Sequence, residues 1–214
     1  MENLQVEFAN VETASFDVKN RILLLPNYSH TDQDVIDLFV GHEVSHALFT
    51  PMDGLATLED KPKNFHSFVN VVEDVRIERK IQDRYPGLRK CFYSAYSKLN
   101  AADFFNIAER DVDKMLYIDR LNIKAKLGTQ IDIQFNEQEL QFNARAKKTE
   151  TFDEVLQLTE EIWEYCKDEL EEKSNDNDMS MDDYLSTGAT ENQNEKDQED
   201  KDTGEGKQSD NAQS

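Results

Sequence analysis

The strongest constraint on the fold is a stretch from residue 31 to residue 49 in which apolar and imidazole side chains recur at helical spacing. Intervals of four and three residues separate the members of this stripe, which are Val35, Phe39, His42, His46 and Phe49. Such intervals place side chains on one face of an α-helix, where they can face the core. Thr31 or Asp32 can cap the start of this helix, and it stops before Pro51. The stretch therefore predicts a buried helix with two histidines on its inner face.

Helical periodicity also dominates the chain from residue 64 to residue 172. The pattern predicts helices over residues 64–85, 88–100, 101–109, 112–127 and 152–172, and a further helix that begins at Asn136. Two pairs have the spacing of capping boxes: Asn136 with Glu139, and Thr151 with Glu154. Two strand-like runs, Leu4–Phe8 and Phe16–Leu25, precede these helices. We therefore expect an α+β fold that is mainly helical, with a small N-terminal β-sheet.

The composition changes sharply near residue 173. Residues 174–214 contain 12 Asp and Glu against three Lys, and they have almost no apolar side chains. Such a segment cannot bury enough apolar surface to offset its chain entropy. We therefore predict three parts: a domain over residues 1–100, a helical extension over 101–173 that packs on it, and a disordered acidic tail over 174–214.

The charge and the cysteines exclude several classes of protein. The net charge of -21 argues against a nucleic-acid partner and against an acidic membrane surface, because both are negatively charged. No run approaches the roughly 20 apolar residues of a membrane span, and the N-terminus does not have the pattern of a signal peptide. Cys91 and Cys166 are far apart and do not form a CxxC pair, as expected for a chain with reduced thiols. These features predict a cytoplasmic protein.

The two histidines on the predicted helix belong to an H-E-x-x-H motif, His42-Glu43-Val44-Ser45-His46. Positions i and i+4 lie about 6 Å apart on one helix face, so both imidazoles can bind one tetrahedral zinc ion (Zn2+). Glu43, next to the first histidine, can act as the general base for a water on that metal. The alternative is a pair of core histidines that bind backbone carbonyls. Two of the four histidines fall in this one turn, which favours zinc.

A third ligand is expected from the predicted helix over residues 64–85. A histidine in the metzincin position is absent, because Met52 stands there. We predict Glu73 as the ligand, with Asp74 as a carboxylate that orients a ligand histidine. Asp74 and Glu78 are alternative ligands, and His66 can serve as a ligand or as a donor to an oxyanion. Without a metal, this acidic run would be read as a solvated helix face with Glu–Arg pairs.

Both motifs together resemble known families. HEVSH at 42–46 with NVVEDVRIE at 70–78 resembles the gluzincin-type zinc metallopeptidases, although Asn70 lies three residues before Glu73 rather than beside it. VEDVRIER at 72–79, with RYPGLR at 84–89, is similar to a stretch in proteins with a von Willebrand factor A domain, including the cobaltochelatase large subunit and a nitric oxide reductase activation protein. Residues 15–100 are most similar to predicted peptidases of T4-like bacteriophages.

These resemblances imply that residues 1–100 form a zincin-like metal-binding domain with zinc as its cofactor, active in the host cytoplasm. Gluzincins commonly have Glu as the third ligand, which supports Glu73. The first hypothesis is a zinc metalloendopeptidase that hydrolyses a peptide or protein substrate held along an edge strand at 21–25; a simple buried strand is the alternative for that run. Four residues are candidates to stabilise the oxyanion: His66, Tyr28, Tyr93 and Tyr96. The second hypothesis is a non-catalytic zinc-binding assembly or adaptor protein that works with an ATPase or a von Willebrand A partner.

Overall fold

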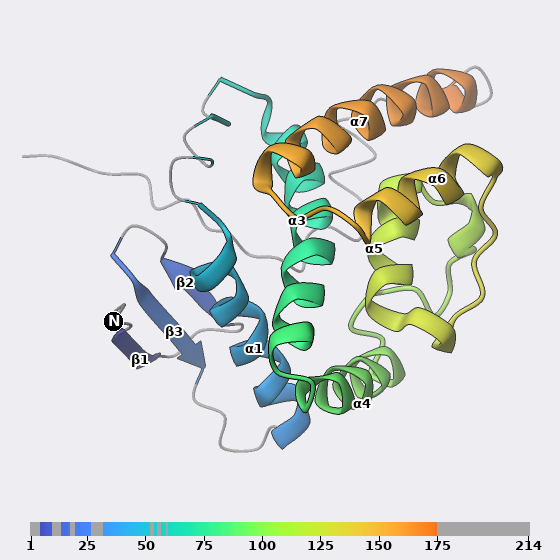
Figure 1. Cartoon of the computed structure of the whole chain (residues 1–214). Helices are drawn as coiled ribbons and strands as arrows, with labels where there is room; N and C mark the ends of the chain where they lie inside the picture. The colour runs from blue at the N-terminus through green and yellow to red at the C-terminus, as the bar shows by residue number, and fades with distance from the viewer. Residues whose placement is uncertain are drawn as a thin grey trace, which may run out of the picture.

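The computed structural model describes residues 5–9, 14–17, 20–26, 32–51, 54, 57, 58 and 60–174. This part of the chain is mainly helical, with a three-stranded sheet at its N-terminal end (Figure 1). The predicted α+β class is therefore confirmed. Thr31, the alternative cap of the helix over residues 31–49, lies outside the described residues, as does the predicted tail apart from Ser174, which ends the last helix.

The sheet has the strand order β1-β3-β2. β1 (Gln5–Ala9) runs parallel to β3 (Ile22–Pro26), and β2 (Ser15–Asp17) runs antiparallel to β3. The single strand expected over residues 16–25 is wrong, because the chain reverses between β2 and β3. Arg21 has a φ of 60° in the left-handed region, and neither Gly nor Pro marks this turn in the sequence.

The position of β3 also decides which strands offer a free edge. β3 is hydrogen-bonded to β1 on one side and to β2 on the other. Strand addition needs an unpaired edge, so the prediction that residues 21–25 hold an extended peptide is wrong. Leu23 and Leu25 instead lie in a small core against Phe39 and Val44 of the first helix, which is the buried-strand alternative.

Within the described residues, the helices after the sheet have bounds close to the predicted ones, except for α5, which begins five residues later than predicted. They are α1 (Gln33–Phe49), α3 (Lys63–Arg84), α4 (Leu88–Ala101), α5 (Tyr117–Leu127), α6 (Glu137–Ala146) and α7 (Phe152–Ser174). Asp32 caps α1 by accepting from the Asp34 N–H. Both predicted capping boxes are confirmed by reciprocal hydrogen bonds, at 136–139 and at 151–154.

Two of the predicted helices differ in the structure. Residues 102–111 form turns rather than a helix, and Asp103 and Asn106 have φ values of 55° and 50°. The Asp103 carboxylate accepts hydrogen bonds from the N–H groups of Ile107 and Ala108, which competes with helix formation. The helix expected over 112–127 is interrupted at Met115 and Leu116, whose backbones are extended after a short 3-10 helix (Val112–Lys114).

The central element is α3, which runs through the middle of the molecule (Figure 1). It contacts α1 and α4 on one side and α5, α6 and α7 on the other. One hydrophobic core joins α3 with α5, α6 and α7, and a second joins α1, α3, α4 and α5. Helices after residue 101 therefore share one core with α3 and the other with α1, α3 and α4, while the predicted division at residue 100 stays a prediction. None of the described helices is long and apolar enough to cross a membrane.

The packing of α1 against α4 fixes the turn that carries the H-E-x-x-H motif. A Cβ on Gly41 would lie 3.0 Å from Phe92 Cε2 of α4, which is closer than side-chain contacts normally come. Gly41 therefore lets α4 approach the backbone of α1 directly beside His42. This close contact holds the histidine turn in a fixed position above α3.

Candidate metal centre

Two helices bring the candidate ligands together. His42 and His46 lie one turn apart on α1, and their rings are 4.9 Å apart in an edge-to-face arrangement. α3 lies against this face of α1 and contributes the carboxylates of Asp74 and Glu78. The side chain of Asp74 is only 3% exposed, whereas those of His42 and His46 are 15% and 23% exposed. The cluster is thus sealed on the α3 side and partly open on the α1 side.

Three ligand atoms converge between the helices. Nε2 of His42 lies 3.6 Å from Oδ1 of Asp74, and Nε2 of His46 lies 3.4 Å from the same oxygen. All three atoms lie within 4.8 Å of one another. A tetrahedral zinc ion with bonds of about 2.0–2.1 Å has ligand–ligand distances of about 3.3–3.4 Å. The spacing and the donor types therefore fit a His2Asp metal site.

The other ring nitrogen of each histidine is already engaged. Nδ1 of His42 lies 2.9 Å from Oε1 of Glu78, and Nδ1 of His46 lies 3.1 Å from Oγ1 of Thr50. The Glu78 carboxylate accepts, so Nδ1 of His42 carries the proton. Hydrogen bonds at Nδ1 of this kind leave the Nε2 lone pair available to a metal and hold the ring in place. Both histidines are thus oriented as ligands.

The structure does not bring Glu73 to the histidines. Its Oε1 accepts from Thr50 Oγ1 at 2.6 Å, and both of its oxygens are bound by Arg76, at 2.6 and 2.7 Å. Glu73 therefore contacts His46 only through Thr50, and Asp74, an alternative in the sequence, takes the place beside Nε2. The two carboxylates thus lie in the reverse of the predicted positions: Asp74 faces the Nε2 atoms, and Glu73 lies behind His46.

The remaining candidates from the sequence have other contacts. His66 Nε2 lies 2.8 Å from the carbonyl oxygen of Leu58, as in an ordinary core histidine. Tyr96 is buried and donates to Glu78 Oε1 at 2.6 Å, so its hydroxyl supports the carboxylate behind His42. Tyr93 is 58% exposed, and Tyr28 lies outside the described residues. Glu43 is half-buried on α1.

The charges of this cluster reinforce one another. Burial alone would lower the pKa of His42, but the charges of Asp74, Glu78 and Glu43 and the hydrogen bond to Glu78 outweigh it and raise this pKa to about 9. Burial would likewise raise the pKa of Asp74, but His42, His46 and Lys126 hold it well below its usual range. Lys126 Nζ lies 3.2 Å from Asp74 Oδ2, the oxygen that faces away from the histidines. Asp74 is therefore a carboxylate at neutral pH.

This arrangement predicts how the metal-free protein responds to pH. A histidine whose pKa is raised from 6.5 to about 9 on folding adds stability that is complete below pH 6.5 and is lost as the pH rises through 9. In the presence of a chelator we expect the free energy of unfolding to fall over this window by at most about 3 kcal/mol. Thermal melts at pH 6, 7.5 and 9 measure this, with His42→Gln as the comparison. Equal pH dependence in the two proteins would contradict it.

Sequence reasoning did not assign functions to Thr50, Arg76 or Lys126. Thr50 lies four residues after His46, so helical spacing could have indicated this contact. The Glu73–Arg76 pair is one of the Glu–Arg pairs expected of this helix, but it is buried rather than solvated. Lys126 lies 52 residues from Asp74, and no local pattern connects the two. Comparison of the chain with protein-family models, with curated proteins and with solved structures finds no match.

Proposed function

We propose that the chain is a zinc-dependent metallopeptidase in which His42, His46 and Asp74 hold the metal and Glu43 is the general base. The observation that supports this most is the pairing of each Nδ1 with an oxygen while both Nε2 atoms lie beside one oxygen of Asp74. A pair of core histidines without a metal function would not require both free nitrogens to face the same carboxylate. The resemblance of the HEVSH and VEDVRIE segments to gluzincin-type enzymes supports the same class.

Each residue of the proposed site has a separate function in hydrolysis. Zinc, when bound, lowers the pKa of a water towards about 7 and polarises the substrate carbonyl. Glu43 accepts the proton of the attacking water on a carboxylate oxygen and delivers it to the amine that leaves. Glu78 holds the orientation of the His42 imidazole through a hydrogen bond at its Nδ1, and Thr50 does the same for the imidazole of His46. Lys126 neutralises the outer oxygen of Asp74 and so reduces the cost of burying this carboxylate.

Zinc binding is the first test of this proposal. The chelator-treated protein is expected to bind one zinc ion per chain, measured by elemental analysis after gel filtration. At a free zinc concentration of 100 times Kd the bound metal stabilises the folded state by about 2.7 kcal/mol, which corresponds to a rise in Tm of about 5–10 °C. Magnesium at the same concentration is the control, because it disfavours imidazole ligands. A chain that binds no zinc and shows no rise in Tm contradicts the proposal.

Peptide cleavage is the second test. The zinc-loaded protein is incubated with an unfolded protein and with a broad peptide library, and new termini are identified by mass spectrometry. Cleavage that stops on addition of a chelator and returns with zinc supports a metallopeptidase. One zinc per chain without cleavage of any substrate or of the chain itself would favour the non-catalytic assembly or adaptor protein instead.

A further inference from the structure

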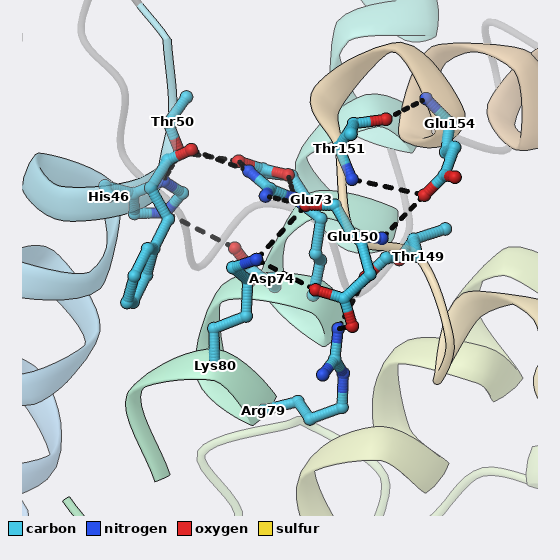
Figure 2. A network of polar contacts seen from close by, with 12 residues as sticks. His46, Thr50, Glu73, Asp74, Arg79, Lys80, Thr149, Glu150, Thr151 and Glu154 are labelled. Atoms are coloured by element: carbon cyan, nitrogen blue, oxygen red, sulfur yellow. Dashed lines mark hydrogen bonds and ion pairs between the residues drawn. The ribbon is translucent and has the colours of Figure 1, made fainter. Parts of the chain in front are cut away.

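A continuous chain of contacts leads from His46 across α3 to the segment between α6 and α7 (Figure 2). Thr50 Oγ1 lies 3.1 Å from His46 Nδ1 and donates to Glu73 Oε1 at 2.6 Å. Arg76 donates to both oxygens of Glu73 and, through Nη1, to the carbonyl oxygen of Glu150 at 3.0 Å. Glu73 and Arg76 are both only 3% exposed. The contacts therefore form a buried link between a metal ligand and the start of α7.

The direction of the hydrogen bonds in this link is determined by its members. A threonine hydroxyl has one proton, and Thr50 gives it to the Glu73 carboxylate. Its oxygen can then only accept from His46, so Nδ1 of His46 carries a proton, and Nε2, which lies 3.4 Å from Asp74 Oδ1, is the nitrogen left to bind a metal. Glu73 thus sets the tautomer of His46 through Thr50. A histidine in the other tautomer could not bind a metal through Nε2.

Arg76 joins this link to two other parts of the chain. Its Nη2 donates to the carbonyl oxygen of Phe49, the last residue of α1, at 2.8 Å. This carbonyl is one of those that a helix end leaves without an intrahelical partner. The Phe49 contact holds the end of α1, next to Thr50, while the Glu150 contact holds the α6–α7 connection. The buried Arg76 guanidinium therefore holds two backbone segments beside Glu73, the end of α1 and the α6–α7 connection.

The α6–α7 connection is attached to α3 by two further cations. Arg79 donates to the carbonyl oxygen of Thr149 at 2.5 Å and pairs with the Glu150 carboxylate at 2.9 Å. Lys80 binds the same carboxylate at 3.0 Å. The capping box of Thr151 and Glu154 begins α7 immediately afterwards (Figure 2). The residues that hold the start of α7 therefore lie on the same face of α3 as Glu73.

We propose that Thr50, Glu73 and Arg76 are positioning residues for the metal ligand His46, and that they make zinc affinity depend on the docking of the α6–α7 connection. This inference rests on the zinc site proposed above and goes beyond it, because it assigns a function in metal binding to a segment more than 100 residues after His46. It also gives a reason for the burial of the Glu73–Arg76 pair, since neither residue is one of the proposed metal ligands.

Thr50→Val tests the near end of the link, with Thr50→Ser as the matched control. Valine has the shape of threonine but offers no oxygen to His46, whereas serine keeps the hydroxyl. We expect Thr50→Val to raise the zinc Kd by about 10- to 100-fold and Thr50→Ser to leave it within about threefold. The Kd is measured by competition with a chelator, and the Co2+ spectrum reports any change in ligand geometry. The Tm of the metal-free proteins shows whether each variant is folded.

Arg76→Lys tests the far end, with Arg145→Lys as its control. A lysine cannot reach both Glu73 oxygens and both carbonyls at once, so we expect the zinc Kd to rise by about tenfold. Arg145 makes a similar two-bond pair with Glu161 between α6 and α7, but it is 45% exposed and does not contact Glu73. Arg145→Lys is expected to bind zinc as the unmodified protein does.

The outcomes separate the link from the proposed site. If the unmodified chain binds zinc and Thr50→Val binds it equally tightly, the link is overturned and the metal site stands. If Thr50→Val weakens binding but Arg76→Lys does not, the dependence on the α6–α7 connection is overturned. If the unmodified chain binds no zinc, both the site and the link are overturned. Weaker binding in both variants, with both controls unchanged, supports the inference.

Discussion

Asp74→Asn is expected to lose zinc at metal concentrations that saturate the unmodified chain, with an increase in Kd of more than about 100-fold, because an amide replaces the charged ligand of the proposed site. Glu73→Gln is expected to keep one zinc per chain and to raise the Kd by about 10-fold, as a change behind His46 should. The two substitutions make the same chemical change at neighbouring residues. Chelator competition and elemental analysis measure both.

His66→Gln completes this comparison, because His66 was also a candidate ligand from the sequence. Its Nε2 contacts the carbonyl of Leu58, so we expect this variant to bind zinc with unchanged stoichiometry and affinity. Asn at position 74 also leaves Lys126 without its carboxylate, so the Tm of the metal-free variant is measured alongside. Loss of zinc in Glu73→Gln together with its retention in Asp74→Asn would reverse the assignment of the ligands.

The exchange of Glu73 and Asp74 has a physical origin in the burial of α3. Successive residues of a helix point about 100° apart, so a sequence can select between them only where one face is clearly polar. Between Val71 and Ile81 most side chains of α3 are buried, including the charged Glu73, Asp74, Arg76 and Glu78. This helix is covered on several sides by other helices. Its orientation therefore depends on tertiary packing, and the hydrophobic pattern does not reveal it.

Local signals explain what the sequence did predict. The caps of α1, α6 and α7 depend on residues at most four positions apart, and the structure has all three. His42, Glu43 and His46 share one helical turn, so their proximity follows from helix geometry alone. The contacts of Lys126 with Asp74 and of Arg76 with Glu150 join residues 52 and 74 positions apart. Only the packing of α5 and α7 on α3 creates them.

The β2–β3 hairpin is a second feature that depends on tertiary contacts and that local sequence patterns do not predict. Phe16–Leu25 reads as one strand-like run, and the reversal between the strands depends on a left-handed backbone at Arg21. Arginine has no preference for this conformation. Arg21 Nη1 donates to the carbonyl oxygen of Ala47 near the end of α1 at 2.8 Å, so the turn is stabilised by a contact that forms only in the folded protein.

Glu43→Gln is expected to keep zinc and to reduce peptide cleavage by a factor of about 10² to 10⁴, the usual contribution of a general base. Glu43 is not among the three converging ligand residues, and glutamine preserves its size. The negative charge of Glu43 contributes to the raised pKa of His42. Its removal reduces the competition of protons for this ligand, so the zinc affinity at neutral pH should not fall. The loss should appear in kcat, with KM little changed.

Asp37→Asn is the matched control for Glu43→Gln, because it makes the same change from acid to amide on α1. Asp37 accepts a hydrogen bond from Gln33 at the helix surface and does not belong to the ligand cluster, so both zinc binding and cleavage should be retained. Cleavage that survives Glu43→Gln would remove Glu43 from the mechanism and leave the metal site intact. Zinc lost together with cleavage would mean that Glu43 helps to build the site, and the separation of metal binding from proton transfer would then be wrong.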